Sequence, residues 1–335
     1  MKRIVVIVFL LTLKLSAQKV VGHVFDAKTK EPIVGASVYY DASSIGTITD
    51  ENGDFEIELA YQNNATLVIR YLGYVTKKMI SLPKEAVLNI GLEEDIENLA
   101  EVVLTSDPFT RKDKMEVFRL EFLGDTRAGR ASKILNEDDI HLYFNSQENT
   151  LSAFCDKPVI IQNGYLGYTI HFTIDEFKIF FRKKSLERID NVYYTLFDGT
   201  TRFYDDSKGD LKIESRRRRA YLGSPRHFMQ SCWRGDLQSQ NFRLKKKYKD
   251  IEIGDFIKNE NNHLGDLKSI RFLGDQFVIY HKIKSNYRST LKINKVYTTH
   301  LLDRYGNYSP FENLVFGGHM SSYRIGNMLP MNYGF

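Results

Sequence analysis

The chain has 335 residues, of which 42% are hydrophobic and 27% charged, and its formal net charge is +5. Its 22 phenylalanines and 20 tyrosines exclude a disordered chain, because a solvated coil carries few aromatic residues. Two cysteines are too few for a disulfide-stabilised scaffold, and the length favours two domains over one.

The N-terminal residues have the three parts of a secretory signal peptide. Lys2 and Arg3 precede an apolar run over residues 4–13, and the small residue Ala17 stands at the expected cleavage point. The run is too short to span a bilayer as a helix. We therefore predict that residues 1–17 are removed on export to the periplasm or the outer membrane. No cysteine stands near the cleavage point, so we expect no lipid anchor.

Charge is distributed unevenly along the rest of the chain. Residues 18–106 carry a net charge of −7, whereas residues 178–249 carry +11. The turn-forming cluster Ser106-Asp107-Pro108 lies where the composition changes, and its proline disfavours a helix before it. We therefore predict one domain over residues 18–106 and a second over residues 107–335.

The first of these domains has the pattern of a β-sandwich. Short runs rich in β-branched and aromatic residues cover residues 20–26, 34–41, 45–49, 54–59, 66–71, 75–81 and 87–92. The run at 54–59 alternates strictly between apolar and acidic residues, which places one face in a core and the other in water. Gly53 is expected to supply the positive φ of the turn before it. We predict a seven-stranded sandwich whose core includes Phe25, Val38, Phe55, Ile57, Leu59 and Ile69.

Three stretches of this domain carry a family resemblance. They are Val21-Gly22-His23-Val24-Phe25-Asp26, Glu31-Pro32-Ile33-Val34-Gly35-Ala36-Ser37-Val38 and Gly46-Thr47-Ile48-Thr49-Asp50-Glu51-Asn52-Gly53-Asp54-Phe55. Through them, residues 20–104 resemble the carboxypeptidase-regulatory-like domain, a prealbumin- or transthyretin-like sandwich. That domain follows the catalytic unit of some metallocarboxypeptidases and begins many outer-membrane nutrient receptors of the Bacteroidetes type. The resemblance implies this fold and a cell-envelope location; it implies no peptidase chemistry, because the domain is an accessory in those enzymes.

The second domain is predicted to have a mostly antiparallel α+β fold. Helices are expected at residues 110–122 and 216–233, the latter interrupted near Gly223-Ser224-Pro225. Strands are expected at residues 140–144, 151–154, 159–161, 167–174, 177–181, 192–197, 201–204, 211–215, 277–284 and 291–296. Residues 110–335 also resemble the C-terminal region of stand-alone secreted proteins that carry this sandwich, and that resemblance implies no function.

The sequence lacks the patterns of the common catalytic and metal sites. The two closest histidines, His263 and His281, are 18 positions apart, which excludes His-x-His and His-Glu-x-x-His ligand pairs. No Gly-x-Ser-x-Gly turn, phosphate-binding loop or dinucleotide fingerprint occurs. We therefore predict no catalytic residues, no metal and no cofactor. A zinc site assembled from distant residues is the remaining alternative.

The two cysteines allow three interpretations. Cys155 follows an apolar run and Cys232 precedes Trp233, which favours two buried thiols. In an oxidising compartment they could instead form one disulfide. The third interpretation is that one of them is a nucleophile paired with a histidine.

The strongest polar feature is a basic segment with interleaved aromatic residues. Its candidate anion- or partner-binding residues are Arg216, Arg217, Arg218, Arg219, Arg226, Arg234, Lys245, Lys246 and Lys247. Such a group can bind an anionic glycan, a lipid headgroup or an envelope protein. It could equally be a solvated surface, or a surface that docks the acidic sandwich. Nucleic acid is not expected as a partner, because the predicted compartment lacks it.

Two functions fit this sequence. The favoured one is a non-catalytic secreted envelope protein that binds through a sandwich docking module and a basic α+β domain. The alternative is a peptide or glycan hydrolase whose catalytic residues are dispersed over residues 110–335. The carboxylate pairs Asp138/Asp139 and Asp205/Asp206 fit a hydrolase poorly, because adjacent residues of a strand face opposite ways.

Overall fold

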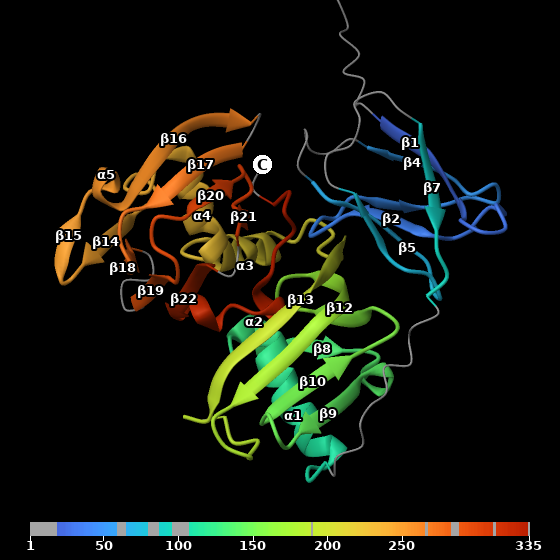
Figure 1. Ribbon diagram of the computed structural model, residues 1–335, viewed down its shortest axis with the longest axis horizontal. Helices are drawn as coiled ribbons and strands as arrows, with labels where there is room; N and C mark the ends of the chain where they lie inside the picture. Colours follow the sequence, from blue (N-terminus) through green and yellow to red (C-terminus); the bar gives the residue numbers. More distant parts are fainter. Residues whose placement is uncertain are drawn as a thin grey trace, which may run out of the picture.

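The computed structural model describes residues 19–58, 65–79, 87–95, 107–188, 190–264, 267–282, 288–310 and 313–333, with the backbone alone for 261–264. The predicted signal peptide lies outside the described residues. The described chain is rich in strands (Figure 1). Its buried apolar side chains form three hydrophobic clusters. We call the three parts around them the sandwich (residues 19–95), the central part (107–221) and the distal part (225–322). The prediction of one domain over residues 107–335 stays a prediction.

The sandwich has the seven strands that the sequence predicts. One sheet has the order β4-β1-β7, with β7 parallel to β1, and the other has the order β3-β2-β5-β6. The strands are β1 (Lys19–Asp26), β2 (Ser37–Tyr40), β3 (Gly46–Ile48), β4 (Asp54–Glu58), β5 (Leu67–Arg70), β6 (Lys77–Met79) and β7 (Leu88–Leu92). The turn into β4 requires Gly53, whose φ is +78° and whose Cα faces the carbonyl of Val24. The predicted fold class is confirmed.

The core of the sandwich agrees with the prediction except at one residue. Val38, Phe55, Ile57 and Ile69 are buried in one cluster. Phe25 is only partly buried, because Val24 occupies the inward position of β1 and successive residues of a strand face opposite ways. The predicted core residue Leu59 lies outside the described residues.

The central part is a six-stranded sheet with a helix packed on it. The sheet has the order β8-β11-β12-β10-β9, and β13 pairs with β12. The elements are α1 (Arg111–Leu123), α2 (Arg127–Arg130), β8 (Ser132–Ile134), β9 (His141–Asn145), β10 (Thr150–Phe154), β11 (Val159–Asn163), β12 (Tyr168–Phe181) and β13 (Val192–Asp205). Each of the two long strands was predicted as two shorter ones; a bulge between Ile174 and Glu176 interrupts the alternation of β12 without ending it.

Two consecutive helices connect the central and distal parts. The predicted strand over residues 211–215 is wrong, because this stretch is the start of α3 (Leu211–Tyr221), where the Asp210 side chain accepts a hydrogen bond from the backbone amide of Lys212 at 2.7 Å. The predicted interruption is confirmed. There, Ser224 caps α4 (Pro225–Arg234), whose first position is a proline, and Gly235 ends it with a φ of +76°.

The distal part is built from two small antiparallel sheets and α4. One sheet has the order β15-β14-β18-β19-β22 and the other β16-β17-β20-β21. Its elements are β14 (Phe242–Lys246), β15 (Lys249–Ile251), α5 (Ile253–Phe256), β16 (Ile257–Leu264), β17 (Leu267–Phe272), β18 (Gln276–His281), β19 (Arg288–Ile293), β20 (Thr299–Leu302), β21 (Tyr308–Ser309) and β22 (Leu314–Gly318). Phe228, Phe256 and Phe277 are fully buried between the helix and the sheets.

The final residues of the described chain connect the three parts. After the distal part, Ile325 and Leu329 pack into the cluster of the central part, whereas Met331 packs into that of the sandwich. The backbone amide of Met331 donates to the carbonyl of Ala42 at 2.5 Å. We call residues 323–333 the closing segment.

Candidate functional site

The structure does not bring the nine predicted binding residues together on one surface. Arg217 is buried inside the protein. Its guanidinium donates to the carbonyl of Leu166 at 2.7 Å and to both carboxylate oxygens of Asp205 at 2.8 Å. It also lies 3.7 Å above the ring centre of Tyr168, and the side chain is buried. These hydrogen bonds hold the pKa of Asp205 well below its usual range. Arg217 therefore fastens α3 to the central sheet.

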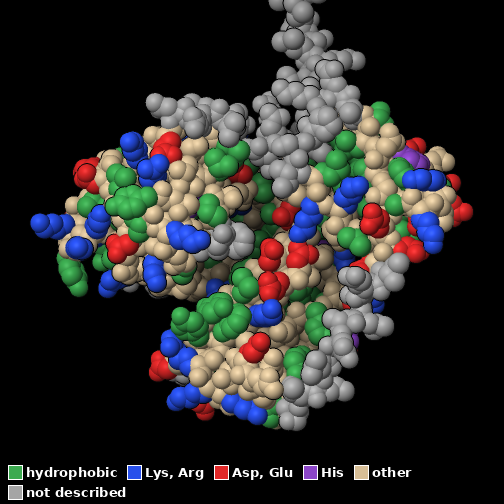
Figure 2. Space-filling view, in the orientation of Figure 1, with side chains coloured by type: hydrophobic (Ala, Val, Ile, Leu, Met, Phe, Trp, Pro, Cys, Tyr) green, Lys and Arg blue, Asp and Glu red, His purple; other side chains and the backbone are tan. Residues whose placement is uncertain are grey.

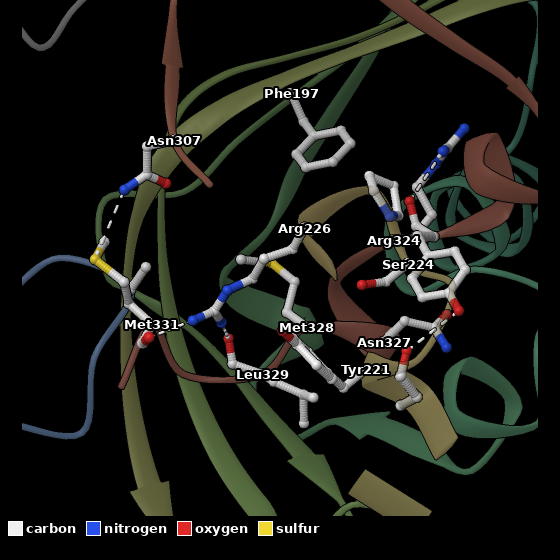
Figure 3. Close-up of a pocket in the computed structure, with 14 residues that line it drawn as sticks. Phe197, Tyr221, Ser224, Arg226, Asn307, Arg324, Asn327, Met328, Leu329 and Met331 are labelled. Atoms are coloured by element: carbon white, nitrogen blue, oxygen red, sulfur yellow. Dashed lines mark hydrogen bonds between the residues drawn. The ribbon is translucent and has the colours of Figure 1, made fainter. Parts of the chain in front are cut away.

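Arg226 is likewise used inside the protein. Its guanidinium donates to the carbonyls of Leu329 at 3.0 Å and Pro330 at 2.6 Å, and also to the carbonyl of Met331. In Figure 3 the side chain extends from α4 toward Leu329 and Met331. A single guanidinium with five N–H donors can satisfy several carbonyls at once, so Arg226 holds the closing segment in place.

The candidate residues of the distal part lie apart from α3. Arg234 pairs with Asp236 at 3.1 Å, and the Nζ of Lys246 donates to the carbonyl of Leu273 at 2.7 Å. Lys245 and Lys247 belong to the β14–β15 hairpin, where Lys247 is exposed. On the face seen in Figure 2, Lys and Arg side chains are spread over the surface and do not gather into one patch.

Two of the predicted residues, Arg216 and Arg219, do share a groove. They lie three positions apart on α3 and so face the same side of the helix. Opposite them, Arg127 of α2 approaches Tyr165, whose ring centre is 5.3 Å from Arg127 and 4.9 Å from Arg216. The groove has a volume of about 450 Å³. We call these four residues the arginine groove. Arg218, between the two α3 arginines, is exposed and does not line it.

The arginine groove carries an unbalanced positive charge. No aspartate or glutamate stands among the described residues that line it, which also include Thr126, His319, Tyr323 and Asn327. Nor does any of its three arginines form an ion pair within the described part of the chain. Guanidinium groups so placed can bind phosphate, sulfate or carboxylate oxygens in pairs.

An apolar pocket of about 230 Å³ adjoins the groove and shares Ala220, Tyr323 and Asn327 with it. Figure 3 shows Phe197 from β13 on one side of this pocket and Met328 on the other, with Arg226 between them. Its polar groups are largely engaged: besides Arg226, Arg324 donates to the carbonyl of Glu121 at 2.9 Å. The pocket therefore offers apolar contact beside the charged groove.

The residues considered for catalysis do not form a common site. Asp205 is paired with Arg217, and Asp206 accepts a hydrogen bond from the Thr169 hydroxyl at 2.6 Å. Asp139 lies 3.6 Å from the Nζ of Lys157. Within the described ranges, no three His, Cys, Asp or Glu side chains are grouped as metal ligands would be.

The two cysteines are free and buried, in agreement with the first interpretation, and the disulfide interpretation is wrong. Cys155 belongs to the cluster of the central part and Cys232 to that of the distal part, so tertiary packing keeps them apart. Burial raises the pKa of both thiols. A protonated thiol is a poor nucleophile, which disfavours the third interpretation.

Sequence comparison identifies the sandwich. Residues 20–104 match the family model of the CarboxypepD_reg-like domain. Over 87 residues the chain is 34% identical to the TonB-dependent receptor SusC of Bacteroides thetaiotaomicron, an alignment that covers 26% of this chain and 8% of the receptor. The chain thus spans less than a tenth of that relative's length. The match confirms the resemblance of the sandwich.

Comparison with solved structures gives partial likenesses. A type II cohesin–X-dockerin complex from Acetivibrio cellulolyticus is 24% identical, covers 22% of this chain and 51% of that chain, and has a TM-score of 0.18. A putative membrane-associated protein of unknown function from Bacteroides fragilis is 8% identical, covers 87% of this chain and 91% of that chain, and also has a TM-score of 0.18. None of the helices in the described ranges has the length and apolar character needed to cross a membrane.

Sequence reasoning missed Arg127 and Tyr165. Both precede the basic segment in the chain by at least 50 positions, and neither carries a local signal of binding. They reach the groove only because the turn before β12 and the short helix α2 pack beside α3.

Proposed function

We propose that this chain is a non-catalytic binding protein of the cell envelope. In this proposal the CarboxypepD_reg-like domain is a docking module, and the arginine groove binds an anionic glycan. The signal-peptide pattern of residues 1–17 and the similarity of the sandwich to a TonB-dependent receptor support an exported protein of the periplasm or outer membrane.

The observation that carries the binding role is the charge of the groove. Arg127, Arg216 and Arg219 line it together, and the described residues around them supply no carboxylate. Like charges held in one groove repel each other, and an oxyanion between them removes that repulsion while it accepts several N–H bonds. The ring of Tyr165 lies within cation–π distance of both Arg127 and Arg216, and this contact helps to hold the two guanidinium groups at the groove.

An anionic glycan is favoured as the ligand by the side chains that line the groove. Its polar side chains, among them Thr126 and Asn327, suit a hydroxylated chain whose sulfate or carboxylate groups meet the arginines. The side chain of Tyr323 adds a ring at the boundary with the apolar pocket.

The test is calorimetric titration of the chain from residue 18 onward with a heparin tetrasaccharide, at low and at high salt. We expect binding that weakens as salt rises, and a loss of at least about tenfold in affinity for Arg216→Ala/Arg219→Ala, since each charge-assisted hydrogen bond contributes more than 1 kcal/mol. The matched control is Arg218→Ala, the exposed neighbour on the same helix. Absent binding, or equal losses in the double variant and the control, would refute the proposal.

A further inference from the structure

A second charged cavity lies at the junction of the sandwich and the central part, separate from the arginine groove. Its volume is about 380 Å³. From the sandwich, its lining includes Ser37 and Tyr39 of β2 and Arg70 at the end of β5. From the central part it includes Asp139, Lys157, His171, Arg202 and Tyr204. We call this the junction cavity. None of these residues lines the arginine groove or the apolar pocket beside it.

The two walls of the junction cavity are fixed to each other by hydrogen bonds. The hydroxyls of Tyr39 and Thr200 lie 2.9 Å apart, and the backbone amide of Ala42 donates to the carbonyl of Thr201 at 2.7 Å. A third bond runs from the amide of Phe203 to the carbonyl of Ser43 at 2.9 Å. The cavity is therefore preformed. Binding of a ligand then requires little further ordering of the protein, so the entropic cost of binding is small.

Arg202 lines the junction cavity with a guanidinium that packs against its neighbours. Its guanidinium is stacked between Tyr204 at 4.9 Å and Tyr39 at 5.8 Å, and the Cα of Gly46 packs so closely that a Cβ there would be 2.8 Å from Cζ. This side chain donates no hydrogen bond to any residue that the structure describes, and its Nε is shielded from solvent. A guanidinium held rigidly without an acceptor is poised to bind one.

Further cations surround Arg202, and only one carboxylate lies among the described lining residues. Arg70 uses one N–H group on the carbonyl of Asp156, which leaves its other donors. Lys157 is 3.6 Å from Asp139, the only acidic side chain among those lining residues, so three cations face one anion. Burial, with the nearby charge of Arg202, lowers the pKa of His171, so this ring is neutral at pH 7 and can exchange hydrogen bonds with hydroxyl groups.

We infer that the junction cavity binds a monosaccharide-sized molecule that carries an oxyanion, either a carboxylate or a phosphate. The oxyanion lies between Arg202 and Arg70, where each guanidinium can donate two parallel N–H bonds. Hydroxyl groups of the ligand meet Ser37, His171 and Tyr204. The volume suits one sugar ring, and it falls within the range of small-molecule sites.

Such a ligand contacts the sandwich and the central part at once. Binding free energy then adds to the stability of the junction, since a molecule that binds only the assembled form raises the unfolding temperature. This inference does not depend on the arginine groove. If one of the two sites binds no ligand, the proposal for the other site still stands.

The test uses glucuronate, glucose 6-phosphate and neutral glucose, with affinity from calorimetry and unfolding temperature from a thermal-shift assay. We expect at least one of the two acids to bind and raise the unfolding temperature, and glucose to do neither. The acid that binds more tightly identifies the oxyanion. Arg202→Gln is expected to weaken binding by at least about tenfold, and Arg70→Gln provides a second variant if the first fails to fold.

The matched control for these variants is Arg243→Gln. Arg243 also lies over a tyrosine ring, that of Tyr280 at 5.1 Å, but it belongs to the distal part. The Arg243→Gln variant should bind the acid with the same affinity as the unmodified chain. The Arg216→Ala/Arg219→Ala variant should do so as well. The inference is overturned if neither acid binds, if glucose binds as well as the acids, or if Arg202→Gln and Arg70→Gln bind as tightly as the control.

Discussion

The carboxylate of Asp41 in the sandwich accepts a hydrogen bond from the backbone amide of Thr201, 160 residues later in the chain, at 2.7 Å. Burial at this contact raises the pKa of Asp41 to about 6. The folded protein therefore holds the proton of Asp41 more tightly than the unfolded chain does. It follows that Asp41 makes the junction less stable as the pH rises from about 4 through 6, and that the effect is complete above that range.

The substitution Asp41→Asn tests this titration. The side-chain amide of the variant would keep an acceptor oxygen for the Thr201 amide but carry no charge at any pH. At each pH, the quantity of interest is the free energy of unfolding of Asp41→Asn minus that of the unmodified chain. We expect this difference to be larger at pH 7.5 than at pH 4 by about 1–3 kcal/mol. Urea unfolding of both proteins at the two pH values measures this difference. The same difference at both pH values would contradict the assigned pKa.

Phe55 and Phe25 provide a matched pair in the sandwich. Phe55 is buried against Gly22, whereas Phe25 is partly exposed and stacks on His23. We expect Phe55→Ala to lower the free energy of unfolding by about 3–5 kcal/mol, and Phe25→Ala to lower it by less than about 1.5 kcal/mol. Equal losses from denaturant unfolding would show that the two rings are not on opposite faces of the sheet.

Arg217 is predicted to be a structural residue despite its place in a run of four arginines. Arg217→Met removes the donors for Asp205 and for the carbonyl of Leu166, and we expect a loss of about 3 kcal/mol. Arg218→Met on the same helix should change stability by less than about 0.5 kcal/mol. Heat or denaturant unfolding distinguishes them. If Arg217→Met unfolds like the unmodified chain but loses ligand binding, its assigned role is wrong.

Arg226 is predicted to control the closing segment. Lysine has a single ammonium group and cannot reach the carbonyls of Leu329, Pro330 and Met331 together, so Arg226→Lys should loosen the segment. We expect faster hydrogen exchange and faster proteolysis at residues 323–333, with the sandwich core unchanged. Arg234→Lys, a surface pair with Asp236, is the control. Unchanged protection of the segment in Arg226→Lys would contradict this role.

The sequence predicts the sandwich well because its signals are local. Strict alternation marks residues 54–59, and turn residues such as Gly53 separate the strands. The alternation of Leu211 and Ile213 predicts a strand where the structure has the first turn of α3. The cap that begins this helix is one hydrogen bond from the Lys212 amide to Asp210, and the sequence pattern does not reveal it. Local patterns therefore identify elements more reliably than they identify where an element begins.

The candidate sites are harder to predict because their residues come together only in the folded chain. Helical spacing places Arg216 and Arg219 on one side of α3, but it cannot show that Arg217 meets Asp205 or that Arg127 faces the same groove. The junction cavity joins Arg70 to Arg202 across two parts of the protein, and neither residue stands in a basic run.

The closing segment has a consequence for the order in which the protein is assembled. Asn332 bonds Ser44 across 288 residues at 2.9 Å, next to the backbone contact between Met331 and Ala42. The strands of the sandwich can pair as soon as residues 19–95 have been synthesised, but the core of the sandwich is completed only when Met331 packs into it. Contacts of such long sequence separation form late and slowly. The interval before they form leaves Ala42 and its neighbours exposed, and this is the period in which a chaperone or a second copy of the chain has access to them.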